Sequence, residues 1–399
     1  MRWLLLLGLW LCYFSFGAII ASLAPLVPVI QADLELSHAA MGSIMGAWQL
    51  VYIVAAIPGG MLLDRLGARA ALLAGVALVA ASALGRAFAV DYWSMLLAVM
   101  LFGAGGPIIS SGAPKLVTEI FEGSSRGLAM GIYMTGPTLG GVAALTLTHP
   151  VLMPLLHGDW RAVLLVWALL AVLAGAVWWA IATYAARRLP GFDQSRESVS
   201  ATQGSAPIRS ILQLGSVRLV LAMSVGVFLI NHGLSNWLPE MLRTGGMSAT
   251  AAGNWAALPM LVGAIGSLII PRLATPSRRF RILTLLCLST AVASAALTVV
   301  NPAVLSVALV LQGLVRASLM TVLILTLMEL PGLDPRHAGT ASGLFFSAAQ
   351  VGGVLGPVGL GWLYDLTGSF DPGLYALTAV AVAMLLGTLR LGAQVRNAA

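Results

Sequence analysis

The decapeptide Gly60-Met-Leu-Leu-Asp64-Arg65-Leu-Gly67-Ala-Arg69 carries three charges between two apolar runs, at 40–63 and 70–89. A helix needs about 20 apolar residues to cross a bilayer, and both runs are long enough. The decapeptide therefore predicts a short polar turn between two membrane-spanning helices, which sets the pattern for the rest of the chain.

The composition agrees with a membrane protein. Of the 399 residues, 59% are hydrophobic and 9% are charged, and the mean hydropathy is +0.95. Soluble domains carry about 25% charged residues, so a soluble enzyme, a disordered chain and a nucleic-acid-binding protein are excluded. The two cysteines, Cys12 and Cys287, lie inside apolar runs. We expect no disulfide framework, no metal site and no cofactor.

Twelve apolar stretches are candidate spans. They cover residues 3–30, 40–63, 70–89, 94–118, 127–148, 162–184, 217–238, 248–273, 281–300, 303–329, 338–364 and 373–391. The first is too long for a signal peptide, and Pro25 would block cleavage at the small residues before it. We predict an all-α membrane protein with twelve transmembrane helices.

The basic residues predict the orientation of these spans. With the N-terminus in the cytoplasm, most of the 21 Lys and Arg residues fall in inner connections or at the termini, whereas the outer loops keep Arg161 and Arg243. Cytoplasmic loops of membrane proteins carry this excess. We therefore expect both termini to be cytoplasmic, and we expect the protein to lie in the inner membrane of a bacterium.

The chain divides into two similar halves. Residues 185–216 form the longest polar stretch and have the composition of a flexible linker. The predicted domains are six-helix bundles at 1–184 and 217–399. Residues 36–42 align with 247–253 at an offset of 211, and a Gly-Pro pair occurs in both halves, at Gly136-Pro137 and Gly356-Pro357. Such pseudo-symmetric repeats are typical of transporters with a midplane substrate site.

The decapeptide resembles the signature loop of the major facilitator superfamily, Gly-x-x-x-Asp-Arg/Lys-x-Gly-x-Arg/Lys. Together with the twelve spans, the repeat and the linker, this resemblance covers essentially the whole chain. It implies a gating role, in which Asp64 pairs with an arginine near a helix N-terminus. The other interpretation is that these charges only mark an inner loop. The matching turn at 271–280 keeps basic residues without an acid, so we expect an asymmetric latch.

Two further resemblances concern the branch of the superfamily. The stretch from Gly136 to Gly141 is similar to a motif of proton-coupled drug antiporters, although close helix packing also explains small residues there. Four other features resemble the cyanate and nitroimidazole permease-like branch and related organic-anion carriers. These are Arg86, Pro114-Lys115, Glu329-Leu-Pro-Gly-Leu and Gly361-Trp-Leu-Tyr-Asp365-Leu-Thr-Gly368.

Arg316 is the most informative charge because it lies at the midpoint of the tenth span. An arginine at the bilayer centre costs at least about 2.5–3.5 kcal/mol, so it must face a wet cavity or a partner. No Asp or Glu lies near the middle of any span, and the superfamily resemblance implies that the tenth helix lines a central cavity. We predict that Arg316 binds an anion and that Gln312, one turn earlier, shares its face. Bracing of two helices by Arg316 is the alternative.

Other polar residues are candidates for the same cavity. Each of them is also explained by an interhelical hydrogen bond, and His232 is a candidate for proton coupling. They are Asn231, His232 and Asn236 in the seventh span, Trp48, Gln49 and Tyr52 in the second, and Tyr13, Tyr133 and Gln350 in the first, fifth and eleventh.

These residues predict a secondary transporter that moves a small organic or inorganic anion, with the bilayer as its setting and without a nucleic-acid partner. We expect it to be a monomer, with protons as an optional coupling ion. One alternative is a proton-coupled exporter of drugs or hydrophobic compounds, which the lack of a mid-span carboxylate disfavours. Another is a membrane sensor that binds ligand without transport. No catalytic or metal-ligand cluster lies within a span, so we do not expect an enzyme.

Overall fold

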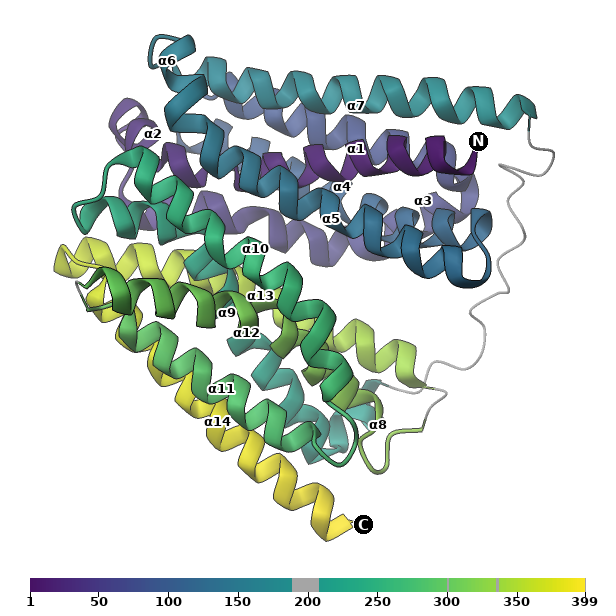
Figure 1. Cartoon of the computed structure of the whole chain (residues 1–399), viewed down its shortest axis with the longest axis vertical. Helices are drawn as coiled ribbons and strands as arrows, with labels where there is room; N and C mark the ends of the chain where they lie inside the picture. The colour runs from purple at the N-terminus through teal and green to yellow at the C-terminus, as the bar shows by residue number, and fades with distance from the viewer. Residues whose placement is uncertain (189–207, 300, 335–336, 399) are drawn as a thin grey trace. The chain divides into compact units, whose positions relative to one another are not determined.

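The computed structural model describes residues 1–188, 208–299, 301–334 and 337–398, which are helical apart from short turns (Figure 1). The side chains of Asp64, Ser124, Ala338, Asn397 and Ala398 lie outside this description. In chain order the elements are α1 (Arg2–Ala21), the 3₁₀ turn η1 (Ala24–Leu26), α2 (Val27–Leu34), α3 (His38–Ala87), α4 (Tyr92–Ile120), α5 (Gly123–Leu147), the π-helical turn η2 (Thr148–Leu152), α6 (Met153–Leu155), α7 (Trp160–Arg188), α8 (Ile208–Gln213), α9 (Gly215–Thr244), α10 (Ala249–Leu273), α11 (Arg279–Ala296), α12 (Pro302–Met328), α13 (Ala338–Thr367) and α14 (Asp371–Ala398).

Within the described residues, twelve helical segments are long and apolar enough to cross a membrane, which confirms the predicted all-α fold. The second and third predicted spans both belong to α3. They are separated at Gly67, which has φ 74° and ψ 166°, a conformation that only glycine adopts at little cost. The first predicted span is divided into α1, η1 and α2, with Pro25 inside η1.

The chain forms two compact units. Unit 1 comprises residues 1–36, 43–199 and 248–257, and unit 2 comprises 37–42, 200–247 and 258–399. Each unit thus includes a short segment from the other half of the sequence. The two exchanged segments begin at Ser37 and Ser248, which are separated by the same 211 residues as the sequence repeat. The predicted linker falls largely on residues 189–207, outside the described residues, and stays a prediction.

Inside unit 1, α1 packs along α5 and α7. Glycines allow the backbones of α1 and α5 to approach closely, because a Cβ on Gly17 would overlap the backbone of Pro137, and one on Gly140 would overlap the carbonyl oxygen of Phe14. Gly136 faces Trp10 and Tyr13 in the same seam. Close packing of small residues is a principal source of helix association in membranes, so it accounts for the Gly136-Pro137 segment.

Inside unit 2, α9 packs along α13 in the same manner, and α11 packs along α12 and α14. Figure 1 shows α11 and α14 side by side. A Cβ on Gly352 or Gly356 would overlap the backbone of α9. The α9–α13 seam of unit 2 therefore repeats the α1–α5 seam of unit 1, with Gly352 and Gly356 in the places of Gly136 and Gly140.

Candidate functional site

Helix α12 carries the candidate site at its centre. The helix begins after Asn301, whose side-chain oxygen accepts hydrogen bonds from the N–H groups of Ala303 (2.9 Å) and Val304 (3.2 Å). Pro302 occupies the first turn, where it needs no N–H partner. Arg316 follows at the midpoint, about 20 Å from either end at 1.5 Å per residue. That distance prevents its side chain from reaching the membrane surface.

The guanidinium of Arg316 makes no hydrogen bond or ion pair with any residue that the structure describes. The residue is half-buried. Its backbone carbonyl accepts a hydrogen bond from Nδ2 of Asn231 (3.0 Å), which ties α12 to α9. The hydrogen bond that joins α12 to α9 at this residue is therefore made by the backbone of Arg316 and not by its guanidinium.

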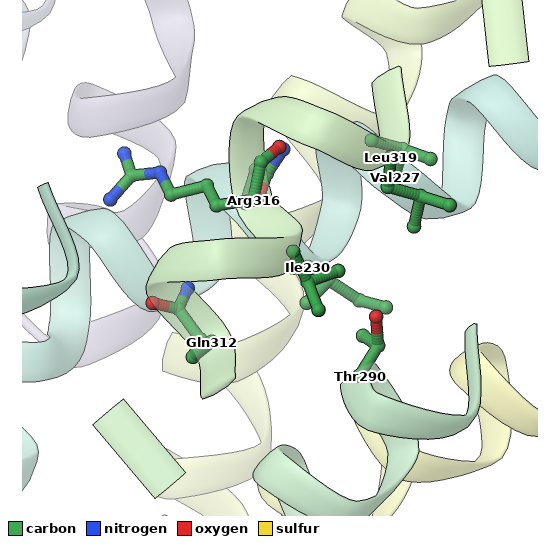
Figure 2. Close-up of a pocket in the computed structure, with 8 residues that line it drawn as sticks. Val227, Ile230, Thr290, Gln312, Arg316 and Leu319 are labelled. Carbon is green, nitrogen blue, oxygen red and sulfur yellow. The ribbon is translucent and has the colours of Figure 1, made fainter. Parts of the chain in front are cut away.

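Gln312 lies one turn before Arg316. Only 6% of its surface is exposed, and its Oε1 atom has no hydrogen-bond partner in the described part of the chain. Figure 2 shows the amide of Gln312 and the guanidinium of Arg316 on the same side of α12, whereas Val227 and Leu319 lie on the other side. The expected shared face is thus present.

A small hollow adjoins these two residues. Its cavity volume is about 10 Å³, roughly the room that one water molecule needs. An organic anion does not fit into a hollow of this size. The lining residues are Val227, Ile230, Asn231, Thr290, Gln312, Val315, Arg316 and Leu319.

The other polar residues of α9 lie close to this group. Asn236 donates a hydrogen bond from Nδ2 to the carbonyl of His232 (2.8 Å), and the His232 ring lies 5.3 Å from the ring of Phe228. His232 is near enough to Arg316 for the two charges to interact when the imidazole is protonated. The sequence candidates Arg316, Gln312 and Asn231 thus line one hollow, with His232 and Asn236 on the adjoining turns of α9.

Five predicted site residues lie together in unit 1 instead. Tyr13 donates from its hydroxyl to the carbonyl of Ile109 (3.0 Å) and packs against Tyr133, with ring centroids 5.1 Å apart. Tyr52 bonds Ser110 (2.8 Å) and contacts Trp48. The remaining member, Gln49, is fully buried, and neither polar atom of its amide has a partner among the described residues.

Gln350, on α13 in unit 2, is likewise buried, with its Oε1 unpartnered within the described chain. The structure thus assigns hydrogen bonds to Tyr13 and Tyr52. The whole amide of Gln49 and the amide oxygen of Gln350 have no partner among the described residues.

The gating motif is described only in part, because the side chain of Asp64 is outside the description. Arg69 donates a hydrogen bond to the hydroxyl of Thr183 (2.8 Å) and lies 4.5 Å from the ring of Trp179. Arg65 is exposed, and a Cβ on Gly60 would meet nothing within 4 Å. The contacts of Arg69 join α3 to α7 inside unit 1, and the gating role of the motif stays a prediction.

Two other arginines make hydrogen bonds to protein atoms. Arg86 is 2% exposed and donates from Nη1 to the carbonyl of Ile19 at the end of α1 (2.9 Å). In the second half, Arg279 forms a bidentate pair with Glu329 (2.5 and 2.9 Å). That acid follows the end of α12 and does not belong to the turn that the repeat aligns.

Sequence reasoning also missed a polar and aromatic cluster at the start of α3. Asp365 of α13 accepts hydrogen bonds from the backbone N–H groups of His38 (2.9 Å) and Ala39 (2.8 Å), so it caps the N-terminus of α3. The His38 ring packs 3.9 Å from Tyr364 and 5.5 Å from Trp237. A signal was present, because Gly361-x-x-x-Asp365-x-x-Gly368 repeats the spacing of Gly60-x-x-x-Asp64-x-x-Gly67.

No group of three or more His, Cys, Asp or Glu side chains in the described residues is placed to hold a metal ion. The chemistry available at α12 is hydrogen-bond donation by a guanidinium and acceptance by an amide oxygen.

Comparison with known proteins gives one family and several transporters. The model of the Major Facilitator Superfamily matches residues 9–357. The chain is 28% identical over 294 residues to the gallate transporter of Pseudomonas putida, covering 67% of this chain and 65% of that protein. It is 24% identical over 446 residues to the probable galactarate/D-glucarate transporter GudP of Bacillus subtilis (strain 168), covering 98% and 91%.

A solved structure of a variant of the nucleoside transporter NupG has the same fold, with a TM-score of 0.78 at 12% identity. The match covers 98% of this chain and 99% of NupG.

Proposed function

Because the chain belongs to the Major Facilitator Superfamily, a family of multi-pass membrane transporters, we propose that it moves small organic carboxylates across the membrane and binds them through Arg316. The curated relatives support the substrate class, since one is named for gallate and another for galactarate and D-glucarate. Each of these compounds carries a carboxylate.

The unpaired guanidinium of Arg316 is the observation that carries this proposal. Burying a charge is costly unless the charge is paired and hydrogen-bonded. Among the described residues Arg316 has no such partner, and the sequence places no acid near the middle of any span. A planar guanidinium donates two parallel hydrogen bonds to a carboxylate, so a carboxylate substrate supplies both the charge and the acceptors.

The sequence repeat supports a transport cycle of alternating access. We place the protein in a bacterial inner membrane with both termini cytoplasmic, which the distribution of basic residues supports. Two six-helix halves would alternate in exposing the site to each side, driven by an ion or substrate gradient. His232, beside Arg316, is the candidate proton carrier, and the turn with Gly60, Asp64 and Arg69 is the candidate inner gate.

Counterflow of labelled gallate and D-glucarate in proteoliposomes tests the proposal. We expect Arg316→Ala to lower the initial rate about 100-fold, because loss of one partner of a desolvated charge pair costs about 2–5 kcal/mol. Arg316→Lys should retain the charge but lose the bidentate geometry, so its initial rate should lie between the rates of the native protein and of Arg316→Ala. Arg281→Ala, which removes an exposed arginine of the same unit, is the matched control and should transport normally.

Undiminished counterflow of both acids by Arg316→Ala would contradict the proposal. If that variant instead exported hydrophobic compounds normally, and activity failed when Gly136 or Pro137 was replaced, the drug-exporter alternative would be favoured. Ligand binding in detergent without any counterflow by the native protein would favour a sensor.

A further inference from the structure

The side-chain amide of Gln312 is a second unsatisfied group beside Arg316. Its Oε1 is a hydrogen-bond acceptor, is buried, and has no partner among the described residues. An acceptor in that condition has lost its water and gained no protein donor in exchange. A ligand with a hydrogen-bond donor close to Oε1 would supply the missing hydrogen bond.

Other polar side chains around the hollow differ from Gln312 in this respect. Asn231 uses its amide to donate to the carbonyl of Arg316 (3.0 Å), and Thr290 uses its hydroxyl to donate to the carbonyl of Leu286 (2.8 Å). Both bonds are made to the protein backbone. Among the side chains that line the hollow, Gln312 has a buried acceptor without a described partner, and it lies one turn from the donors of Arg316.

The positions of the two groups restrict the ligand. They are separated by four residues on one helix, so their Cβ atoms lie about 5–6 Å apart, and Figure 2 shows both polar ends on the same side of α12. A ligand that satisfies both must carry an acceptor for Arg316 and a donor only a few bonds away for Gln312. A carboxylate fills the first role.

The donor is expected to be neutral. An ammonium group would place a second positive charge beside Arg316, in a region where the sequence supplies no acid, and like charges in a medium of low dielectric repel strongly. A hydroxyl group donates a hydrogen bond without adding charge. Resting on the proposed function, we infer that Gln312 is a specificity-determining residue that selects carboxylates with a nearby hydroxyl group over the same acids without one.

Direct binding to the purified full-length protein tests this inference with two matched pairs of acids, lactate with propionate and 3-hydroxybenzoate with benzoate. Isothermal titration calorimetry should show about tenfold tighter binding of the hydroxylated member, the magnitude of one hydrogen bond to a buried group. Gln312→Met has a similar volume and no acceptor. It should reduce that ratio to near one by weakening only the hydroxylated acid.

Two further variants separate recognition from structure. Ser318→Ala removes a buried hydroxyl of α12 that donates to the carbonyl of Leu314 (2.7 Å), and it should leave the ratio unchanged. Gln312→Glu retains an acceptor but places a carboxylate beside Arg316, so it should weaken every acid by competing for the guanidinium.

An unchanged ratio in Gln312→Met overturns the inference. If Arg316→Ala still abolishes binding of both acids in that case, the proposed function stands alone. Equal weakening of both members of a pair by Gln312→Met would show a structural effect and would also overturn the inference. If none of the four acids binds the native protein, both the inference and the carboxylate site fail.

Discussion

Arg86 and Arg316 are both arginines within apolar helices, and neither has an acidic partner in the described parts of the chain. They differ in where their hydrogen bonds go. Arg86 is 2% exposed, donates to the carbonyl of Ile19, and lies 5.4 Å from the ring of Phe102. Arg316 is half-buried and donates to no described residue. The comparison shows that a missing acid does not by itself identify an anion site, because helix-end carbonyls can also hold an arginine.

Replacing each arginine by alanine is the strongest test of this difference. Arg86→Ala should lower the free energy of unfolding by about 2–3 kcal/mol, since it creates a cavity and removes a charged hydrogen bond. Arg316→Ala should not lower it, because no described bond is lost and a charge without a described partner is removed. Thermal unfolding of both variants in detergent, followed by tryptophan fluorescence, measures this. Equal losses would remove the distinction between the two sites.

Asp365 is a third charged residue for this comparison. Like Arg86, it forms hydrogen bonds with backbone groups of the protein, the N–H groups of His38 and Ala39. Asp365→Asn should lower the free energy of unfolding by about 1 kcal/mol, the usual magnitude for loss of an N-cap, because the amide keeps one acceptor but loses the charge that favours a helix N-terminus. Thermal unfolding checks this against Glu35→Gln, which alters an exposed acid. A melting temperature equal to that of Glu35→Gln would show that the cap contributes nothing.

The ion pair of Arg279 with Glu329 should make the smallest contribution to the free energy of unfolding, and this contribution should depend on pH. Two hydrogen bonds from Arg279 lower the pKa of Glu329 below its usual value of 4.5. The resulting stability is fully present above pH 4.5 and is lost as the pH falls through the lower, folded-state pKa. Because Glu329 is half-exposed, we expect about 0.5 kcal/mol.

Melting temperatures of the native protein and Glu329→Gln, measured between pH 7 and pH 3.5, test this. The difference between the two proteins should narrow at the acidic end. A constant difference over the whole range would mean that ionisation of Glu329 does not contribute.

Much of the fold was predictable because the bilayer simplifies the problem. A span must satisfy its own backbone hydrogen bonds and present apolar side chains, so hydropathy identified all twelve segments. The spacing of four residues placed Gln312 on the face of Arg316, since helix geometry is local. Gly67 was readable as a turn for the same reason.

The contacts that escaped prediction are those between distant residues. Arg86 bonds a carbonyl 67 residues earlier, and Arg279 pairs with an acid 50 residues later. Neither partner can be predicted from a local sequence pattern, because any carbonyl or acid at the same height along the helices could bind the arginine. The unsatisfied oxygen of Gln312 is of the same kind, since only coordinates show that neighbouring donors are already used elsewhere.

The exchange of residues 37–42 and 248–257 between the two units has a consequence for synthesis. Unit 1 includes residues 248–257, so the contacts of these residues within the unit form only after they have been synthesised. In the finished unit, Gly253 of that segment lies against the carbonyl of Leu145, and Gly42 lies against the carbonyl of Pro357 in unit 2. The segment that begins at Ser248 therefore joins unit 1 only after all six N-terminal spans have been synthesised.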